Sequence, residues 1–321
     1  MNLSMRTVQP KNPHTRAAVT ASDGIQLAVR DYGPRSASHT VVLLHGLCVS
    51  DTVWSGQVDY LLRTYGNSIR VITYDQRGHG ESGAAPAHTY RIEQLASDLA
   101  DVFTALNVGG HLTLVGHSMG GMAALAYLGR PGAARPVDPR GLVLAATAAG
   151  KLTQRGLGRL LVAPGGGALL TLVDRLPEQA LNVLAGTVCS TLSKIWPAQR
   201  AMLATLAAAA ASTPMPTAAG FLPTLRSYDQ YRTLGGIRAN TVIVSGGTDP
   251  LTPASHSHRL ASAIPAAAHV HIPRAGHMLP REVPDVINHA IRRAMHTDGT
   301  EPFAICRRDI STSANSLGIG A

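Results

Sequence analysis

The stretch Leu112–Leu128, LTLVGHSMGGMAALAYL, decides the fold of this 321-residue chain. It opens with an apolar run short enough for a buried strand, turns sharply over Gly116–Gly120, and continues with residues that favour a helix. A serine at the tip of such a strand–turn–helix unit, here Ser118, is typical of a nucleophile elbow. The helix that follows would direct its free N–H groups and its positive end at this serine. A G-x-S-x-G pattern alone also fits an ordinary glycine-rich turn, so its meaning depends on the rest of the chain.

The composition favours one catalytic domain with an insertion. Hydrophobic residues make up 45% of the chain and charged residues 15%, which is enough to bury a sizeable core. The formal net charge of +9 is spread over scattered basic residues, so we expect no nucleic-acid partner. A transient contact with a membrane surface stays open, but no apolar run is long enough to span a bilayer.

The cysteines and the N-terminal residues predict a reducing compartment. Cys48, Cys189 and Cys306 are widely spaced and odd in number, which fits neither a disulfide framework nor a metal motif. The first 16 residues carry charge but no apolar segment of the kind that a signal peptide needs. We therefore expect a cytoplasmic protein.

Short apolar runs alternate with helix-like segments over most of the chain. This alternation predicts an α/β fold with a doubly wound, mostly parallel sheet, whose ligands bind at the carboxyl ends of the strands. The core is expected over residues 17–146 and 232–297. A hairpin that turns at Asp23-Gly24 is expected at one edge of the sheet.

The remaining segments differ in composition from this core. Residues 1–16 and 298–321 are polar and are expected to be flexible. Residues 147–231 are rich in Ala, Leu, Gly and Pro and show little strand pattern, which predicts an inserted, mostly helical segment. Its candidate helices lie at 179–187 and 198–211.

Three residues with matching chemistry each follow a predicted strand. Ser118, Asp249 and His277 occur in this order, and a further loop, His45–Cys48, follows a continuous apolar strand. Because parallel strands end at the same edge of a sheet, we expect these groups to meet there. The glycine in the fourth loop lets the backbone fold over the sheet and offer the N–H of Leu47 towards Ser118.

Other reactive residues favour structural roles. In the segment DQRGHGES, Asp75 and Arg77 are interpreted as fixing a tight glycine-containing loop, and His79 as a residue without a catalytic role. Cys48 has no adjacent base and is interpreted as a packing residue.

Two histidine pairs superficially suggest a metal site. No carboxylate or cysteine accompanies either pair in a zinc-like pattern, so we predict no metal. No G-x-G-x-x-G or Walker loop indicates a nucleotide or flavin cofactor. The pairs are His256 with His258 and His269 with His271.

The motifs HGLC, YDQRGHGES, GHSMGG, SGGTDP and AGHM, in this order, closely resemble the α/β-hydrolase fold family over roughly Val19 to Met295. The insertion matches the family's cap domain in position and helical character. Some members carry the catalytic acid after the strand that precedes Thr147–Gly150, but this loop contains no carboxylate, which leaves Asp249 as the acid.

The resemblance implies a catalytic triad. Ser118 would be the nucleophile, His277 its general base, and Asp249 the group that orients His277. The backbone N–H groups of Leu47 and Met119 would form the oxyanion hole.

The implied reaction is hydrolysis of a carboxylic ester, as in carboxylesterases and lipases, through an acyl-enzyme and without a cofactor. Epoxide hydrolases and haloalkane dehalogenases of this fold use Asp at the elbow, so Ser118 argues against both. Cofactor-free perhydrolysis of the haloperoxidase type and carbon–carbon bond hydrolysis remain as alternatives, because they use the same triad. A ligand-binding receptor on this fold is the non-enzyme alternative, and the complete triad disfavours it.

The insertion predicts the substrate class, while the identity of the substrate and the oligomeric state stay open. A small, apolar ester is expected if the apolar residues of the insertion line an acyl pocket; the alternative is that they only pack the cap helices against one another. These residues are Leu157, Leu160, Leu161, Leu169, Leu170, Leu172 and Val173.

Overall fold

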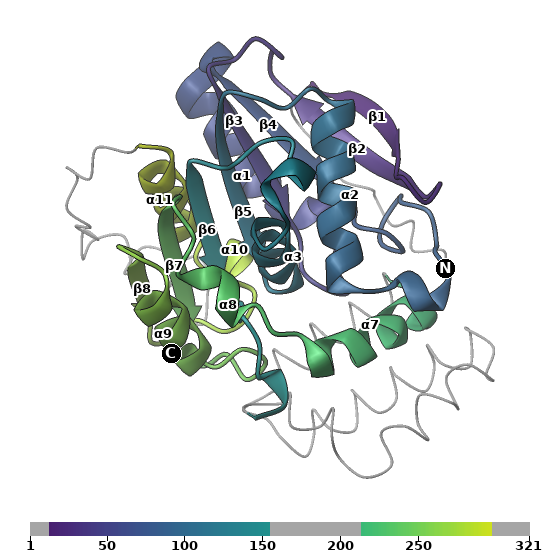
Figure 1. Ribbon diagram of the computed structural model, residues 1–321. Coiled ribbons are helices and arrows are strands. Elements are labelled where there is room, and N and C mark those ends of the chain that lie inside the picture. The colour runs from purple at the N-terminus through teal and green to yellow at the C-terminus, as the bar shows by residue number, and fades with distance from the viewer. Residues whose placement is uncertain (1–12, 155–212, 297–321) are drawn as a thin grey trace, which may run out of the picture.

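The computed structural model describes residues 13–154 and 213–296, in which one eight-stranded sheet runs through the molecule (Figure 1). The strand order is β1-β2-β4-β3-β5-β6-β7-β8. The pairs β1–β2 and β2–β4 are antiparallel and all the others are parallel, so the predicted mostly parallel α/β sheet is confirmed. The strands are β1 (Thr15–Thr20), β2 (Gln26–Tyr32), β3 (His39–Leu44), β4 (Ile69–Tyr74), β5 (His111–His117), β6 (Gly141–Ala145), β7 (Asn240–Gly246) and β8 (Ala268–Ile272).

Helices cover both faces of this sheet, as a doubly wound fold requires (Figure 1). On one face lie α1 (Ser55–Tyr65), α10 (Leu279–Glu282) and α11 (Pro284–Met295). On the other lie α2 (Ile92–Ala105), α3 (Met119–Leu128), α8 (Tyr231–Leu234) and α9 (Ala254–Ala263). Short 3-10 turns are η1 (Asp51–Trp54), η2 (Gly66–Ser68), η3 (Ala87–Thr89), η4 (Gly132–Ala134) and η5 (Leu152–Gln154).

The central strands feed two hydrophobic cores, one on each face. In β3, Val42 and Leu44 belong to the core under α2 and α3, while Val41 and Leu43 belong to the core under α1 and α11. This division follows from the period of two in a strand, in which successive side chains point to opposite faces. Strands with both faces buried read as continuous apolar runs, which is why their positions could be predicted.

The ends of the described segments refine the predicted domain boundaries. The segment 1–16 was expected to be flexible, but Thr15 and Arg16 belong to β1 because they pair with Asp31 and Arg30 of β2. The candidate helices at 179–187 and 198–211 lie outside the described residues.

One helix of the expected insertion, α7 (Met215–Ser227), is described. It lies beside the start of α2, in green in Figure 1. Its Phe221 is fully buried and packs against the rings of Tyr90 and His79, at centroid distances of 5.2 and 6.0 Å. This end of the insertion is therefore anchored on the loop that follows β4.

Close packing of main chain on main chain holds the turn between β5 and α3. A Cβ atom added at Gly120 would lie 2.2 Å from the carbonyl oxygen of Leu44, and one added at Gly116 would lie 2.5 Å from the backbone of Gly121. Both positions require glycine because the neighbouring atoms are backbone and cannot rotate away. The glycines of the sequence pattern G-x-S-x-G-G are thus explained by the close approach of α3 to the main chain of β3 and β5.

Gly120→Ala is expected to lower the free energy of unfolding by about 3 kcal/mol or more, because the added methyl group overlaps the β3 backbone. Urea unfolding followed by circular dichroism measures this loss. Gly132→Ala is the matched control, since nothing lies within 4 Å of its added Cβ, and its effect should stay below about 0.5 kcal/mol. Equal stability of the two variants would contradict this account of the turn.

Candidate active site

Ser118 occupies a strained backbone position at the tip of the turn. Its φ is 51° and its ψ is −119°, a backbone conformation that residues other than glycine rarely adopt. Its N–H donates to the carbonyl of Ala145 at 2.9 Å, and its own carbonyl accepts from the hydroxyl of Thr147 at 2.7 Å. Such strain costs on the order of 1–3 kcal/mol and persists where surrounding contacts enforce it, as these do.

His277 links Ser118 to Asp249. Its Nδ1 lies 2.8 Å from Oδ2 of Asp249, and its Nε2 lies 3.0 Å from Oγ of Ser118. Because a carboxylate only accepts hydrogen bonds, Nδ1 carries the proton and Nε2 is left to accept from the serine hydroxyl. The structure therefore brings the three predicted residues together, from the ends of β5, β7 and β8, in the tautomer that a general base needs.

Hydrogen bonds hold the carboxyl group of Asp249 in its ionised form. Its Oδ1 accepts from the N–H groups of Leu251 and Thr252 at 2.8 and 3.0 Å, and its Oδ2 accepts from the Thr252 hydroxyl at 2.7 Å. Burial alone would raise the pKa of Asp249, but the charge of His277 and the hydrogen bonds from His277 and Thr252 outweigh it and lower the pKa. Thr252 was not among the residues predicted from the sequence, although its place three residues after an aspartate in a turn is a local signal for this contact.

The two predicted oxyanion-hole donors flank Ser118. Met119 begins α3 directly after the serine, and the loop that carries Leu47 lies against it, since a Cβ at Gly46 would be 3.1 Å from Cβ of Ser118. In the described part of the chain the N–H groups of Leu47 and Met119 make no hydrogen bond. Both N–H groups are thus left without an acceptor among the described residues, as the predicted role requires.

The loop after β4 supports the Leu47 loop through two histidines. The N–H of Cys48 donates to Nε2 of His79 at 3.2 Å, and the N–H of Gln76 donates to Nε2 of His45 at 2.9 Å. Burial lowers the pKa of His79 to about 4 and that of His45 to about 3, so both rings are neutral acceptors at neutral pH. The interpretation of His79 as a structural residue agrees with these contacts.

The charged residues of this loop are also held internally. Asp75 accepts from the N–H groups of Asp51 and Glu81 at 2.8 and 2.9 Å, and Arg77 pairs with Asp98 and Asp23. Gly78 and Gly80 have φ values of 74° and 52°. The loop is fixed as the sequence predicted.

Cys48 is partly buried. Desolvation raises the pKa of its thiol to about 12, which disfavours the reactive thiolate. This agrees with its interpretation as a packing residue.

The fold places His258, His269 and His271 together and His256 apart from them. His269 Nε2 and His271 Nδ1 lie 2.8 and 3.0 Å from the hydroxyl of Ser245, and the ring of His258 packs edge-on against His269 at 4.7 Å. His256 is buried inside α9. Within residues 13–154 and 213–296, no group of three or more histidine, cysteine or acidic side chains is placed to hold a metal ion.

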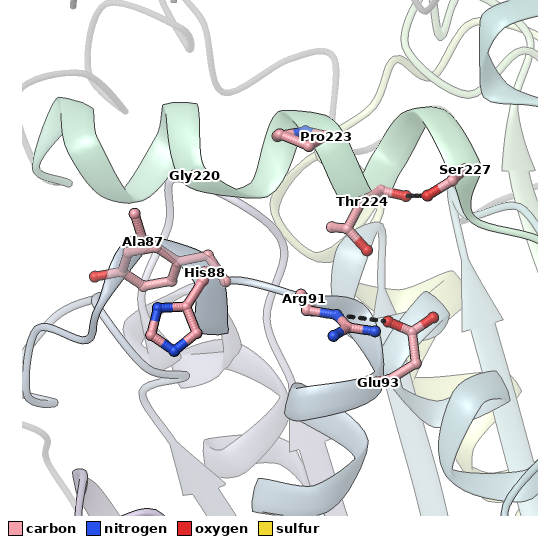
Figure 2. A pocket seen from close by; sticks show the side chains of 9 residues that line it. Ala87, His88, Arg91, Glu93, Gly220, Pro223, Thr224 and Ser227 are labelled. Atoms are coloured by element: carbon pink, nitrogen blue, oxygen red, sulfur yellow. Dashed lines mark hydrogen bonds and ion pairs between the residues drawn. The ribbon is translucent and has the colours of Figure 1, made fainter. Parts of the chain in front are cut away.

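A cavity of about 390 Å³ lies between η3, the start of α2 and α7, as Figure 2 shows. Its wall includes an ion pair between Arg91 and Glu93, at 3.8 Å. None of the predicted site residues lines it, so it is separate from the group around Ser118. The lining residues are Ala87, His88, Tyr90, Arg91, Glu93, Gly220, Pro223, Thr224 and Ser227.

Comparisons with known proteins agree with this architecture. A family model described as alpha/beta hydrolase fold matches residues 39–282. A non-heme haloperoxidase from Rhodococcus erythropolis is 35% identical over 117 residues, which cover 36% of this chain and 40% of that protein. A bifunctional esterase/perhydrolase from Acinetobacter calcoaceticus is 34% identical over 121 residues, covering 38% of this chain and 40% of that protein. The matched region thus spans only about two fifths of these curated relatives.

Solved structures resemble the chain over a larger share of its length. A thermophilic esterase from Thermogutta terrifontis has a TM-score of 0.68 and 26% identity, covering 88% of this chain and 100% of that one. An esterase from Exiguobacterium antarcticum has a TM-score of 0.68 at 23% identity, covering 88% and 99%, and shows the shared fold alone. None of the helices in the described ranges is both long and apolar enough to cross a membrane.

Buried neutral histidines make folding sensitive to acid. The pKa values of His39 and His79 are lowered to about 4, and those of His45 and His117 to about 3, chiefly by burial. In the unfolded chain each titrates near 6.5, so unfolding takes up protons between these values. Their contribution to stability is complete above about pH 6.5 and is lost as the pH falls to about 4 for His39 and His79 and to about 3 for His45 and His117.

Two buried carboxyl groups, those of Asp75 and Asp98, release protons on unfolding and so oppose the uptake by the histidines. Burial raises the pKa of Asp98, and burial together with Asp51 raises that of Asp75 to about 6, so the folded state holds protons that the unfolded state has released. We therefore expect a net uptake of about two to three protons on unfolding between about pH 4.5 and 6. The slope of the unfolding free energy against pH, from urea titrations, measures this uptake. His39→Phe should reduce it by about one proton, and a flat profile in the parent protein would contradict the expectation.

Proposed function

The chain belongs to the alpha/beta hydrolase fold family, and from this premise we propose that it is a serine hydrolase that cleaves carboxylic esters with an apolar acyl group. The observation that carries the proposal is the continuous hydrogen-bonded chain from Ser118 through His277 to Asp249, at 3.0 and 2.8 Å. The complete arrangement disfavours a ligand-binding receptor, because binding alone does not require a nucleophile and a base held in this way. The supporting resemblance to esterases of known structure covers nearly the whole of those chains.

The first half of the reaction acylates the enzyme. His277 takes the proton of the Ser118 hydroxyl while its oxygen attacks the acyl carbonyl, and Asp249 stabilises the imidazolium that forms. The same proton then passes to the leaving alkoxide, so that an alcohol departs and the acyl group stays on Ser118. Backbone N–H groups of Leu47 and Met119 hold the carbonyl oxygen as its negative charge develops, a contribution of roughly 3 kcal/mol per donor.

The second half regenerates the serine. A water molecule gives a proton to His277 and attacks the acyl-enzyme, which releases a carboxylic acid and returns the proton to Ser118. Hydrogen peroxide in place of water would yield a peracid by the same steps. Perhydrolysis is therefore the second candidate activity, and the similarity to a non-heme haloperoxidase and to a bifunctional esterase/perhydrolase favours it.

Ser118→Ala is expected to lower kcat for p-nitrophenyl esters by about 10⁴-fold or more, because the nucleophile is lost. Its melting curve should stay close to that of the parent protein, since removal of one hydroxyl barely changes the packing. Steady-state kinetics measure the loss of kcat. Labelling by a fluorophosphonate, which reacts with an activated serine, should be lost as well.

The matched control is Ser262→Ala, which removes an exposed hydroxyl on α9 that donates only within its own helix. This variant should keep both the turnover and the labelling of the parent protein. Near-normal turnover by Ser118→Ala would remove the central claim, as would covalent labelling of another residue.

The acyl preference is tested with p-nitrophenyl esters of increasing chain length. If the leucine-rich insertion lines the acyl pocket, each buried methylene should contribute about 0.8 kcal/mol, or roughly a fourfold rise in kcat/KM, until the pocket is full. A maximum at acetate with a steady fall thereafter would rule out the apolar pocket. Peracid formation with hydrogen peroxide, measured on the same esters, separates perhydrolysis from hydrolysis.

A further inference from the structure

The backbone around His277 is held by two side chains outside the predicted triad. Nε2 of His117 lies 2.8 Å from the carbonyl oxygen of His277. The carboxylate of Glu282 accepts from the N–H of Gly276 and, at 2.9 Å, from the N–H of Met278. Three consecutive residues of the loop are therefore fixed by hydrogen bonds to their main chain.

The tautomer of His117 follows from its partner. A carbonyl oxygen only accepts hydrogen bonds, so Nε2 of His117 must carry the proton. Its Nδ1 is then an unprotonated acceptor, and this buried atom makes no hydrogen bond in the described part of the chain. Burial lowers the pKa of His117 to about 3, so the ring remains neutral over the range in which a histidine base works.

The ring of His117 also lies next to Gly46, in the loop that carries Leu47. A Cβ added at Gly46 would lie 3.0 Å from Nδ1 of His117, so the ring fills the space beside the loop that carries Leu47. On its other side the ring lies 5.0 Å from that of His277, with an angle of 52° between the planes. The buried ring of His117, 1% exposed, therefore lies between the loop that carries Leu47 and the loop that carries His277.

We propose that His117 is a positioning residue, whose Nε2–H and ring set the distance between the general base and the oxyanion hole. This inference rests on the proposed function, because it assigns a task to His117 within that same site. Loss of the hydrogen bond frees the carbonyl of His277 and allows the imidazole to leave the line between Asp249 and Ser118. A displacement of about 1 Å in such a group can cost about 10²-fold in rate.

The test compares two substitutions at this position. His117→Phe keeps an aromatic ring but removes the donor, and it should lower kcat for p-nitrophenyl esters by about 10- to 100-fold with KM changed less than about twofold. His117→Gln places an amide N–H at a similar reach from the backbone and should recover at least half of that loss on a logarithmic scale. The inactivation rate with a fluorophosphonate should follow the same order as kcat.

His39→Phe is the matched control. It removes a half-buried histidine whose Nε2 lies 3.0 Å from the Thr113 hydroxyl, at the opposite end of β3 from the site. It should leave kcat and KM unchanged. Parent-like kcat in His117→Phe would overturn the proposal, as would a fall in kcat shared equally by His117→Phe, His117→Gln and His39→Phe.

Nuclear magnetic resonance of ¹⁵N-histidine-labelled protein tests the same claim without any substrate. His117 in the full chain should show the Nε2–H tautomer at neutral pH, and the downfield proton resonance of the His277–Asp249 hydrogen bond should shift or broaden in His117→Phe but not in His39→Phe. An Nδ1–H or doubly protonated His117 would overturn the proposal, even if both variants at this position failed to fold. If the parent protein labels with no fluorophosphonate and cleaves no ester, the proposed function fails while these resonances still decide the role of His117.

Discussion

The backbone conformation of Ser118 is the constraint on which the rest of the site depends. With φ at 51°, the serine can be held there only if the strand before it and the helix after it are locked in place. The absence of side chains at Gly116 and Gly120 permits this, because α3 then packs directly on the main chain of β3. Met119, the first residue of α3, directly follows Ser118. The close packing of α3 on the sheet thus fixes the position of Ser118.

The parallel sheet brings the other groups to this point. The loops after β3, β5, β7 and β8 all leave the sheet at the carboxyl ends of its strands, so residues far apart in sequence become neighbours. The loops after β7 and β8 are also joined to each other, since the N–H and the hydroxyl of Thr248 both donate to the carbonyl of Ala275 at 3.0 and 2.9 Å. Asp249 and His277 therefore lie on two loops that hydrogen bonds tie to each other.

The sequence predicted the fold and the meeting of Ser118, Asp249 and His277, because buried parallel strands leave continuous apolar runs and each of these residues follows one. It did not indicate α1, in which only a few side chains are buried among polar ones. Nor did it reveal Thr252, Glu282 and His117 as supports. His117 reaches the carbonyl of His277, which only tertiary folding brings near, and such a contact leaves no periodic pattern in a sequence. Thr252 and Glu282 bond within their own loops, where turn chemistry is the only local signal. The histidine pairs were likewise assessed by spacing, whereas α9 and β8 regroup them in space.

Burial divides the histidines near the site into two kinds. His45, His79 and His117 are at most 1% exposed, and desolvation keeps each of them neutral. Both ring nitrogens of His45 and His79 bond neighbouring main chain, whereas His117 bonds it through Nε2 alone. The side chain of His277 is 12% exposed and contacts the nucleophile instead. A group that exchanges protons during a reaction needs access to substrate and water, while the groups that hold it work best where the low dielectric strengthens their hydrogen bonds. The imidazole group is thus used for support where it is fully buried and, in the proposed mechanism, for proton transfer where it is partly exposed.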